Sequence, residues 1–298
     1  MSEVDVNEND DRFMFKYRGI YFQATYTSPQ TIDSVQDFEV KDSDVFLVTF
    51  PKSGTVWTQQ ILSLIFNEGH RNGTEKIDNM SRVPWIEYNL YQIDYDSRPS
   101  PRLFTSHLPY YLVPKDLKNK KGKIIYVARN PKDVAVSYYH FYKIIVGITQ
   151  KKDWESFLDD YLSGKVLCSS WFDHVKGWYN HQEDFNILFL TYEEMKKDLR
   201  SAVLKICRFV GKELKELEVE AIVEKATFHN MKQDPLANYT FVAEDIFDFN
   251  KGTFLRRGAV GDWKNLMTVA QNEKFDKFYN EKMKDVPMNF TWDINEGN

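Results

Sequence analysis

Four short apolar runs divide the chain, and each is too short for a typical helix. Between and after them, apolar residues recur every three or four positions, which is typical of amphipathic helices. Strands alternating with helices predict an α/β fold in which a mostly parallel central sheet is flanked by helices on both faces. We interpret the whole chain, residues 1–298, as a single domain. The predicted strands are residues 45–50, 102–106, 123–128 and 186–190, and the predicted helices are residues 57–68, 131–145, 153–164, 169–182 and 192–211.

The first strand ends in a short polar loop, Pro51-Lys-Ser-Gly54. A helix with apolar spacing follows from Trp57, and Gly69 is placed to stop it. Strand, tight loop and helix in this order direct backbone N–H groups at the positive end of a helix dipole towards an anion. Lys52 adds a full positive charge there. The pattern indicates an anion site, and the alternative is an ordinary surface turn.

This loop differs from the phosphate loop of nucleoside triphosphatases, which needs Ser or Thr directly after Gly-Lys. The Gly-Lys pairs that begin at Gly122, Gly164 and Gly211 are followed by Ile, Val and Glu. In the predicted loop Lys52 precedes the glycine, so an atypical nucleotide kinase or NTPase stays only as an alternative.

Composition limits the partners and the cellular location that we expect. The net charge is −5, and no apolar run approaches the roughly 18 residues that span a bilayer. We therefore expect no nucleic-acid and no membrane partner. Residues 1–12 are acidic and polar, unlike a targeting segment, and are expected to form a flexible tail. Cys168 and Cys207 give no disulfide framework, which suits a reducing, cytoplasmic location.

The segment Thr49-Phe-Pro-Lys-Ser-Gly-Thr-Val-Trp57 closely resembles the phosphosulfate-binding loop of the cytosolic sulfotransferases. These enzymes use 3′-phosphoadenosine 5′-phosphosulfate (PAPS) as donor and release adenosine 3′,5′-bisphosphate (PAP). The chain as a whole is most similar to the amine sulfotransferases in this family. The resemblance implies a P-loop-like structure in which the donor contacts Lys52, Ser53, Gly54, Thr55, Val56 and Trp57.

Later motifs follow in the order of the same family. Arg129-Asn-Pro-Lys-Asp-x-x-x-Ser137 resembles its 3′-phosphate motif, with Asn130 as a helix N-cap and Pro131 as the first helical residue. The implied donor contacts are Arg129, Ser137, Tyr192, Thr227, Phe228, Met231, Phe254, Leu255, Arg256, Arg257 and Gly258.

Each group has an alternative interpretation without the resemblance. Arg129 and Ser137 could form a cap with a salt bridge, and Tyr192 could cover a helix start. Thr227, Phe228 and Met231 could be the apolar end of a helix.

Ser106-His107-Leu-Pro resembles the family segment with the catalytic histidine, although by itself His107 could be structural like the other five histidines. The resemblance implies that His107 is the general base, that Lys52 stabilises the leaving oxygen, and that Ser137 is a further catalytic residue. No metal is required. A non-catalytic nucleotide binder would keep the same loops without turnover.

Aromatic residues fall at positions that resemble the acceptor pocket of the family, which favours a small, largely aromatic acceptor and a role in xenobiotic metabolism. Thr105 stands where many phenol-sulfating members carry lysine, and this tilts the prediction towards amines or neutral alcohols. Val56 replaces a hydroxyl residue and removes one donor to the phosphosulfate. The implied acceptor contacts are Phe22, Trp85, Tyr88, His107, Tyr139, Phe141, Tyr239 and Phe247.

A motif near the C-terminus concerns assembly. Lys264-x-x-x-Thr268-Val269-x-x-x-Glu273 is similar to the dimer motif of the family and implies a homodimer. Without the resemblance it is an ordinary helix start with scattered charges.

Overall fold

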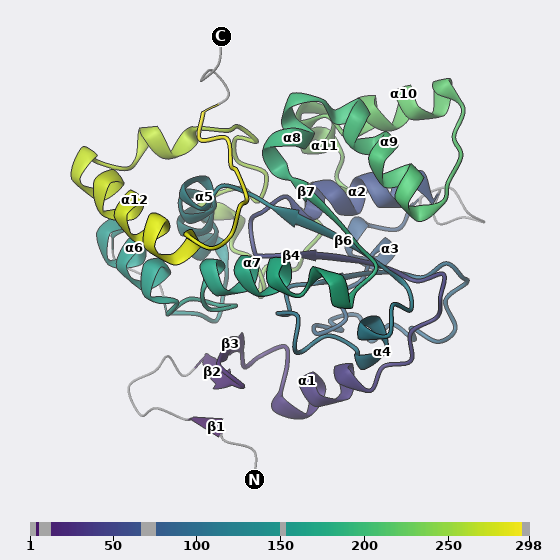
Figure 1. The fold of residues 1–298 in the computed structure, drawn as a ribbon, viewed down its shortest axis with the longest axis horizontal. Helices are drawn as coiled ribbons and strands as arrows, with labels where there is room; N and C mark the ends of the chain where they lie inside the picture. The colour runs from purple at the N-terminus through teal and green to yellow at the C-terminus, as the bar shows by residue number, and fades with distance from the viewer. Residues whose placement is uncertain (1–3, 6–12, 67–75, 150–152, 294–298) are drawn as a thin grey trace.

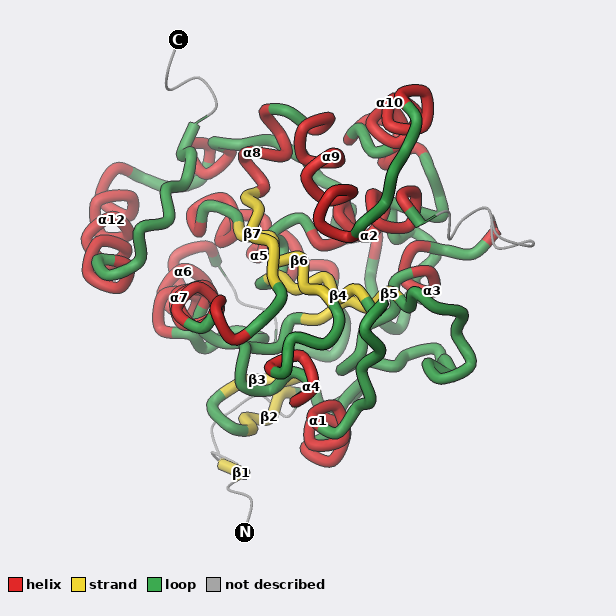
Figure 2. The backbone as a smooth tube through the Cα atoms, turned by 45° about the vertical axis from the view of Figure 1, so that its right-hand side comes forward, coloured by secondary structure: helices red, strands yellow, loops and turns green. Residues whose placement is uncertain are grey.

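Four parallel strands form the central sheet of the computed structural model, which describes residues 4–5, 13–66, 76–149 and 153–293. They are β4 (Val45–Thr49), β5 (Leu103–Ser106), β6 (Lys123–Ala128) and β7 (Ile187–Thr191), in the order β5-β4-β6-β7 (Figure 2). Val45 is paired with both Leu103 and Lys123, which fixes the register of β5, β4 and β6. The predicted α/β fold with a parallel sheet is confirmed.

The two faces of the sheet belong to two hydrophobic clusters. Phe46 and Val48 point into one cluster, while Val45 and Leu47 point into the other, because successive side chains of a strand alternate between faces. On the first face the cluster includes side chains of α5 (Pro131–Ile144), α6 (Trp154–Ser163) and α7 (Trp171–Asn180). On the second face it includes side chains of α2 (Thr55–Ile65), α9 (Leu199–Val210) and α10 (Glu216–Lys225) (Figure 1).

Helix ends agree closely with local signals. Asn130 caps α5 by accepting from the N–H of Asp133, as predicted. The helix predicted over residues 192–211 is two helices, α8 (Tyr192–Lys197) and α9. They separate at Asp198, whose side chain accepts from the N–H of Ser201 and starts a new helix. The helix predicted to stop at Gly69 ends at Ile65, and Gly69 lies outside the described residues.

Several outer elements went unpredicted. A hairpin of β2 (Met14–Tyr17) and β3 (Ile20–Gln23) leads to α1 (Pro29–Gln36), and β1 (Val4–Asp5) pairs with β2. The other residues of the predicted tail lie outside the described part. The predicted loop over residues 71–82 contains α3 (Asn79–Arg82), which Asp78 caps. The remaining elements are α4 (Lys115–Lys118), η3 (Gln182–Asp184), α11 (Phe228–Gln233), η4 (Phe249–Lys251), η5 (Asp262–Asn265) and α12 (Val269–Met283).

The order of the strands locates the site. From β4 the chain crosses to β5 on one side, whereas from β6 it crosses to β7 on the other. The loops after β4 and β6 therefore diverge at the carboxyl edge of the sheet, where open α/β sheets bind ligands. No helix in the described part of the chain is long and apolar enough to cross a membrane.

Candidate functional site

The loop after β4 turns sharply into α2. Lys52 has a φ of +68° and Gly54, the N-cap of α2, a φ of +102°. A Cβ at Gly54 would lie 3.0 Å from the Tyr192 ring, so glycine allows both the backbone angle and this close approach. The Ser53 hydroxyl is buried and has no hydrogen-bond partner among the residues that the structure describes. The loop thus presents its backbone and a lysine at the N-terminal end of a helix, as predicted for an anion site.

The Lys52 ammonium lies over two aromatic rings. Its Nζ is 3.8 Å from the ring centroid of Phe254 and 4.4 Å from that of Phe141. Burial lowers the pKa of Lys52 to about 7, with smaller contributions from Arg129 and Arg256. No carboxylate in the described part of the chain pairs with this ammonium. A lysine held among cations and rings is stabilised in its charged form when an anion binds beside it.

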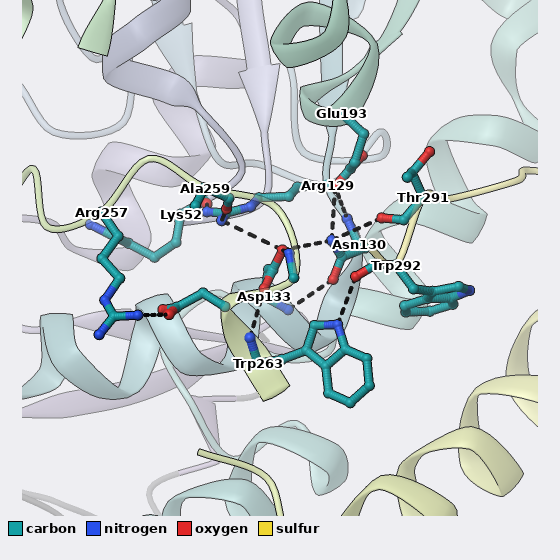
Figure 3. A network of polar contacts seen from close by, with 12 residues as sticks. Lys52, Arg129, Asn130, Asp133, Glu193, Arg257, Ala259, Trp263, Thr291 and Trp292 are labelled. Atoms are coloured by element: carbon teal, nitrogen blue, oxygen red, sulfur yellow. Dashed lines mark hydrogen bonds and ion pairs between the residues drawn. The ribbon is translucent and has the colours of Figure 1, made fainter. Parts of the chain in front are cut away.

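Arg129, at the end of β6, is the second cation of the site. One NH group donates to the carbonyl oxygen of Lys52 at 3.2 Å, and another donates to that of Ala259 at 2.9 Å. The guanidinium also lies 4.2 Å from the ring centroid of Tyr192, while its Nε is buried without a partner. Figure 3 shows this network of contacts around Arg129, Asn130 and Asp133. Arg129 therefore joins the first loop to the segment that contains residues 256–259.

Asp133 and Asp262 hold that later segment in place. Asp133 accepts from the backbone N–H groups of Gly261 and Trp263, at 2.9 and 3.0 Å. Asp262 forms ion pairs with Arg256 and, at 2.7 Å, with Arg257. A Cβ at Gly258 would overlap the Phe228 ring, which explains why a glycine follows the two arginines. Two guanidinium groups and a phenyl ring are thus brought to one wall.

His107, just after β5, faces the same cavity as Lys52. Its Nδ1 lies 2.6 Å from the carbonyl oxygen of Thr49, and because a carbonyl only accepts, this nitrogen carries the proton. Nε2 of the neutral ring is then an acceptor. Burial lowers the pKa of His107 to about 3, so the ring is neutral at physiological pH. The side chain of Glu87, buried behind the loop, accepts from the backbone N–H of His107 at 2.6 Å.

One cavity of about 240 Å³ connects these groups. Beyond His107 its wall is formed by Trp85, whose ring centroid is 4.4 Å from that of His107, and by further apolar and aromatic side chains. Of the predicted residues, those that line the cavity are Lys52, Gly54, Thr55, Val56, Trp57, Trp85, Tyr88, His107, Arg129, Ser137, Phe141, Tyr192, Phe228, Met231, Tyr239, Phe247, Phe254, Leu255, Arg256, Arg257 and Gly258.

Four predicted residues do not line it. Ser53 is buried in the loop, and Thr227 caps α11 instead. Phe22 is stacked on Phe15 inside the hairpin, and Tyr139 packs against Trp154 and Phe157.

Thr105 also lies away from the wall. It is completely buried, donates to the carbonyl oxygen of Val83 at 2.9 Å, and accepts from Gln59 at the same distance. The Gln59 side chain in turn accepts from the hydroxyl of Tyr239 at 2.7 Å. A lysine at position 105 would have to break these buried hydrogen bonds, so the threonine has a structural role behind the wall.

Sequence reasoning missed other lining residues. Gln23 and Tyr26 come from the hairpin region, where the aromatic pattern has no clean period, and Cys168 lies in the loop between α6 and α7. Lys196 could have been found, because it lies four residues after Tyr192 on the same helix face. The others are Pro51, Met80, Leu90, Tyr138, Ile145, Leu167, Ile246, Ala259 and Asp262.

Comparison with known proteins agrees with this geometry. The Sulfotransferase domain family matches residues 42–287, which span the sheet, the loops after β4 and β6, and α12. The chain belongs to the sulfotransferase family. The resemblance seen in its motifs is therefore confirmed, and the kinase alternative is not favoured.

Individual relatives cover nearly the whole length. The amine sulfotransferase of Oryctolagus cuniculus is 54% identical over 97% of both chains. Sulfotransferase 2A1 of Homo sapiens is 40% identical over 95% of this chain and 99% of the relative. Among solved structures, mouse sulfotransferase SULT7A1 complexed with PAP has a TM-score of 0.77 at 34% identity, covering 92% of this chain and 95% of the other.

Proposed function

We propose that this protein transfers the sulfonate group of PAPS to the amine or hydroxyl group of a small, largely aromatic acceptor. The observation that carries the proposal is a single cavity lined by two kinds of side chain. Lys52, Arg129 and the residue 256–258 segment supply cations, and aromatic side chains supply apolar surface. His107 lines the same cavity, and we place the transferring group and the acceptor between it and Lys52.

The donor assignment rests on the two separate anion sites. The Lys52 loop at the start of α2 suits the phosphosulfate, and Arg129 with Ser137 and the two arginines of residues 256–257 suits a second phosphate. The related SULT7A1 structure, which is complexed with PAP, supports a ligand with two phosphates. The described residues contain no group of three or more acidic, histidine or cysteine side chains that could hold a metal ion.

In the proposed reaction the acceptor nitrogen or oxygen forms a bond to sulfur while the bond from sulfur to the bridging oxygen breaks. The acceptor proton goes to Nε2 of His107, which is unprotonated because Nδ1–H donates to Thr49. The negative charge that develops on the bridging oxygen is stabilised by Lys52, and PAP leaves. Ser137 lines the cavity and offers a hydroxyl donor to the phosphate groups of the nucleotide.

The acceptor end favours neutral nucleophiles. Its lining residues in the described part of the chain include no Asp, Glu, Lys or Arg beyond those of the nucleotide end. A protonated amine would find no counter-ion there, so an aryl amine, which is neutral at physiological pH, suits the wall better than an alkyl ammonium. The 54% identical relative named amine sulfotransferase supports amines as acceptors.

A transfer assay with sulfur-labelled PAPS tests the proposal. An aryl amine and a size-matched phenol are compared by kcat/KM in the wild-type protein and in His107→Ala. We expect magnesium-independent transfer to the amine at least as efficient as to the phenol, with the variant nearly inactive. Tight PAP binding without transfer to any acceptor would instead identify a non-catalytic binder, and a strong phenol preference would contradict the acceptor assignment.

We also propose a cytoplasmic homodimer that acts on xenobiotic amines. Thr268 and Glu273 are exposed, and Val269 is 75% exposed although it is apolar, which suits a contact between subunits. The Lys264 ammonium pairs with Asp293 of the same chain at 2.6 Å, so a contact with Glu273 of a second copy would compete with that pair.

A further inference from the structure

Lys196 is a cation of the cavity that none of the sequence motifs includes. It lies four residues after Tyr192 on α8, and both side chains line the cavity because residues at this spacing share a helix face. The neighbouring Lys197 is exposed and does not line the cavity. The two adjacent lysines of one short helix therefore have different surroundings.

The acidic neighbours of Lys196 are already engaged. Glu193 accepts from the backbone and side-chain nitrogens of Asn130, at 2.8 and 3.0 Å. Glu194 accepts from the N–H of Thr191 as part of the cap of α8. Within the described part of the chain, no hydrogen bond or ion pair is formed by the Lys196 ammonium. Its charge is thus not neutralised by the helix that carries it.

The positive charge of Arg129 acts on Lys196. Burial and then this charge lower the pKa of Lys196. The Arg129 guanidinium lies on the ring of Tyr192, and its buried Nε has no partner among the described residues. Two cations that line one cavity, one of them with an unused buried donor, cost free energy in the protein alone and are stabilised by an anion.

The charge balance around this point calls for more than one negative charge. Arg129, Lys196, Arg256 and Arg257 line the cavity, and Asp262 is the one carboxylate among the described lining residues. That carboxylate is shared by Arg256 and Arg257. Asp133, which is buried behind the cavity, pairs with Arg129 at 3.9 Å, so four cations face two carboxylates. A phosphate monoester, with a charge of about −1.5 to −2 near neutral pH, would balance the surplus.

We propose that Lys196, on α8, is a binding residue for the 3′-phosphate of the nucleotide and acts together with Arg129. The inference rests on the proposed function, because it takes PAPS and PAP as the ligands. It adds a contact from the β7–α8 unit to those from the β6–α5 loop and the residue 256–258 segment. Three separate parts of the chain would then recognise the phosphate that does not react.

Calorimetry with two nucleotides distinguishes recognition of the 3′-phosphate by Lys196 from a general loss of nucleotide affinity. PAP carries the 3′-phosphate, whereas adenosine 5′-phosphate lacks it. For Lys196→Gln we expect PAP affinity to fall by about tenfold, because one charge-assisted contact is lost, with the affinity for adenosine 5′-phosphate changed less than about twofold. Lys196→Arg should retain most of the affinity, since it keeps the charge.

Lys197→Gln is the matched control, because it removes one positive charge from the same helix outside the cavity. Equal losses of PAP affinity in Lys196→Gln and Lys197→Gln would overturn the proposal, as would equal losses for both nucleotides in Lys196→Gln. Thermal unfolding curves of each variant report whether α8 is intact, and Lys196→Arg gives a second reading if the glutamine variant unfolds. Wild-type protein that binds PAP no better than adenosine 5′-phosphate would refute the proposed function itself.

Discussion

Binding of PAP should be coupled to proton uptake at Lys52. The pKa of about 7 means that roughly half of these side chains are uncharged at pH 7 and about nine-tenths at pH 8. Phosphate oxygens beside the ammonium favour its charged form and raise the pKa of Lys52 in the complex. At pH 8 the Lys52 side chain of the protein alone therefore holds fewer protons than that of the complex, and binding takes up about 0.9 proton.

The same linkage weakens binding as the pH rises. If Lys52 is fully charged in the complex, the Kd for PAP increases about fivefold between pH 7 and pH 8, because the charged fraction of the free protein falls from about one-half to one-eleventh. The positive charges that act on Lys52 are those of Arg129 and Arg256, and the buried His107 is neutral in this pH range.

Calorimetry at pH 8 in buffers of different ionisation enthalpy measures the uptake directly, as the slope of observed enthalpy against buffer enthalpy. Lys52→Arg is the control, since arginine keeps the charge and does not titrate. We expect the slope to disappear in that variant, apart from any contribution of Lys196, whose pKa is also lowered. A wild-type slope of zero, or the same slope in both proteins, would refute the reasoning.

Three further outcomes are expected. His107→Ala should lower kcat by about 10²–10⁴ and leave PAP affinity within twofold; a variant with half of the wild-type activity would assign the base elsewhere. Gly258→Ala should weaken PAP binding about tenfold or more, because its methyl group meets the Phe228 ring and its backbone angle is left-handed; unchanged affinity by calorimetry would contradict this. Val269→Glu should give an active monomer by light scattering, with a melting temperature close to wild type since Val269 is 75% exposed; an unchanged dimer would place the interface on another surface.

Much of the donor site could be predicted because its signals are local. A buried strand, a glycine turn and a helix start lie within about a dozen consecutive residues at positions 45–57, and the cap at Asn130 needs only the next three residues. The same local signals failed at Asp198, where a second cap begins inside one apolar pattern. Family motifs then named residues such as Tyr192 and Phe254, which lie far apart in the chain but line one cavity.

The acceptor wall was less accessible to sequence reasoning. Phe22 and Tyr139 are aromatic and lie beside lining residues, yet their rings pack against Phe15 and against Trp154 and Phe157. Their neighbours Gln23 and Tyr138 line the cavity instead. Neighbouring side chains of a strand or helix point in different directions, so a shift of one position exchanges wall for core.

The sequence by itself determined the parallel α/β fold, the turn from β4 into α2, the cap of α5 and the family, because each depends on residues that are close together or on a motif in fixed order. Only the tertiary structure decided that Gln59 links Thr105 to Tyr239, that Asp262 binds both arginines, and that Lys196 and Arg129 line one cavity. These pairings depend on how segments tens of residues apart pack together. Burial and like charge there set the pKa values of Lys52 and His107, and no local pattern records either effect.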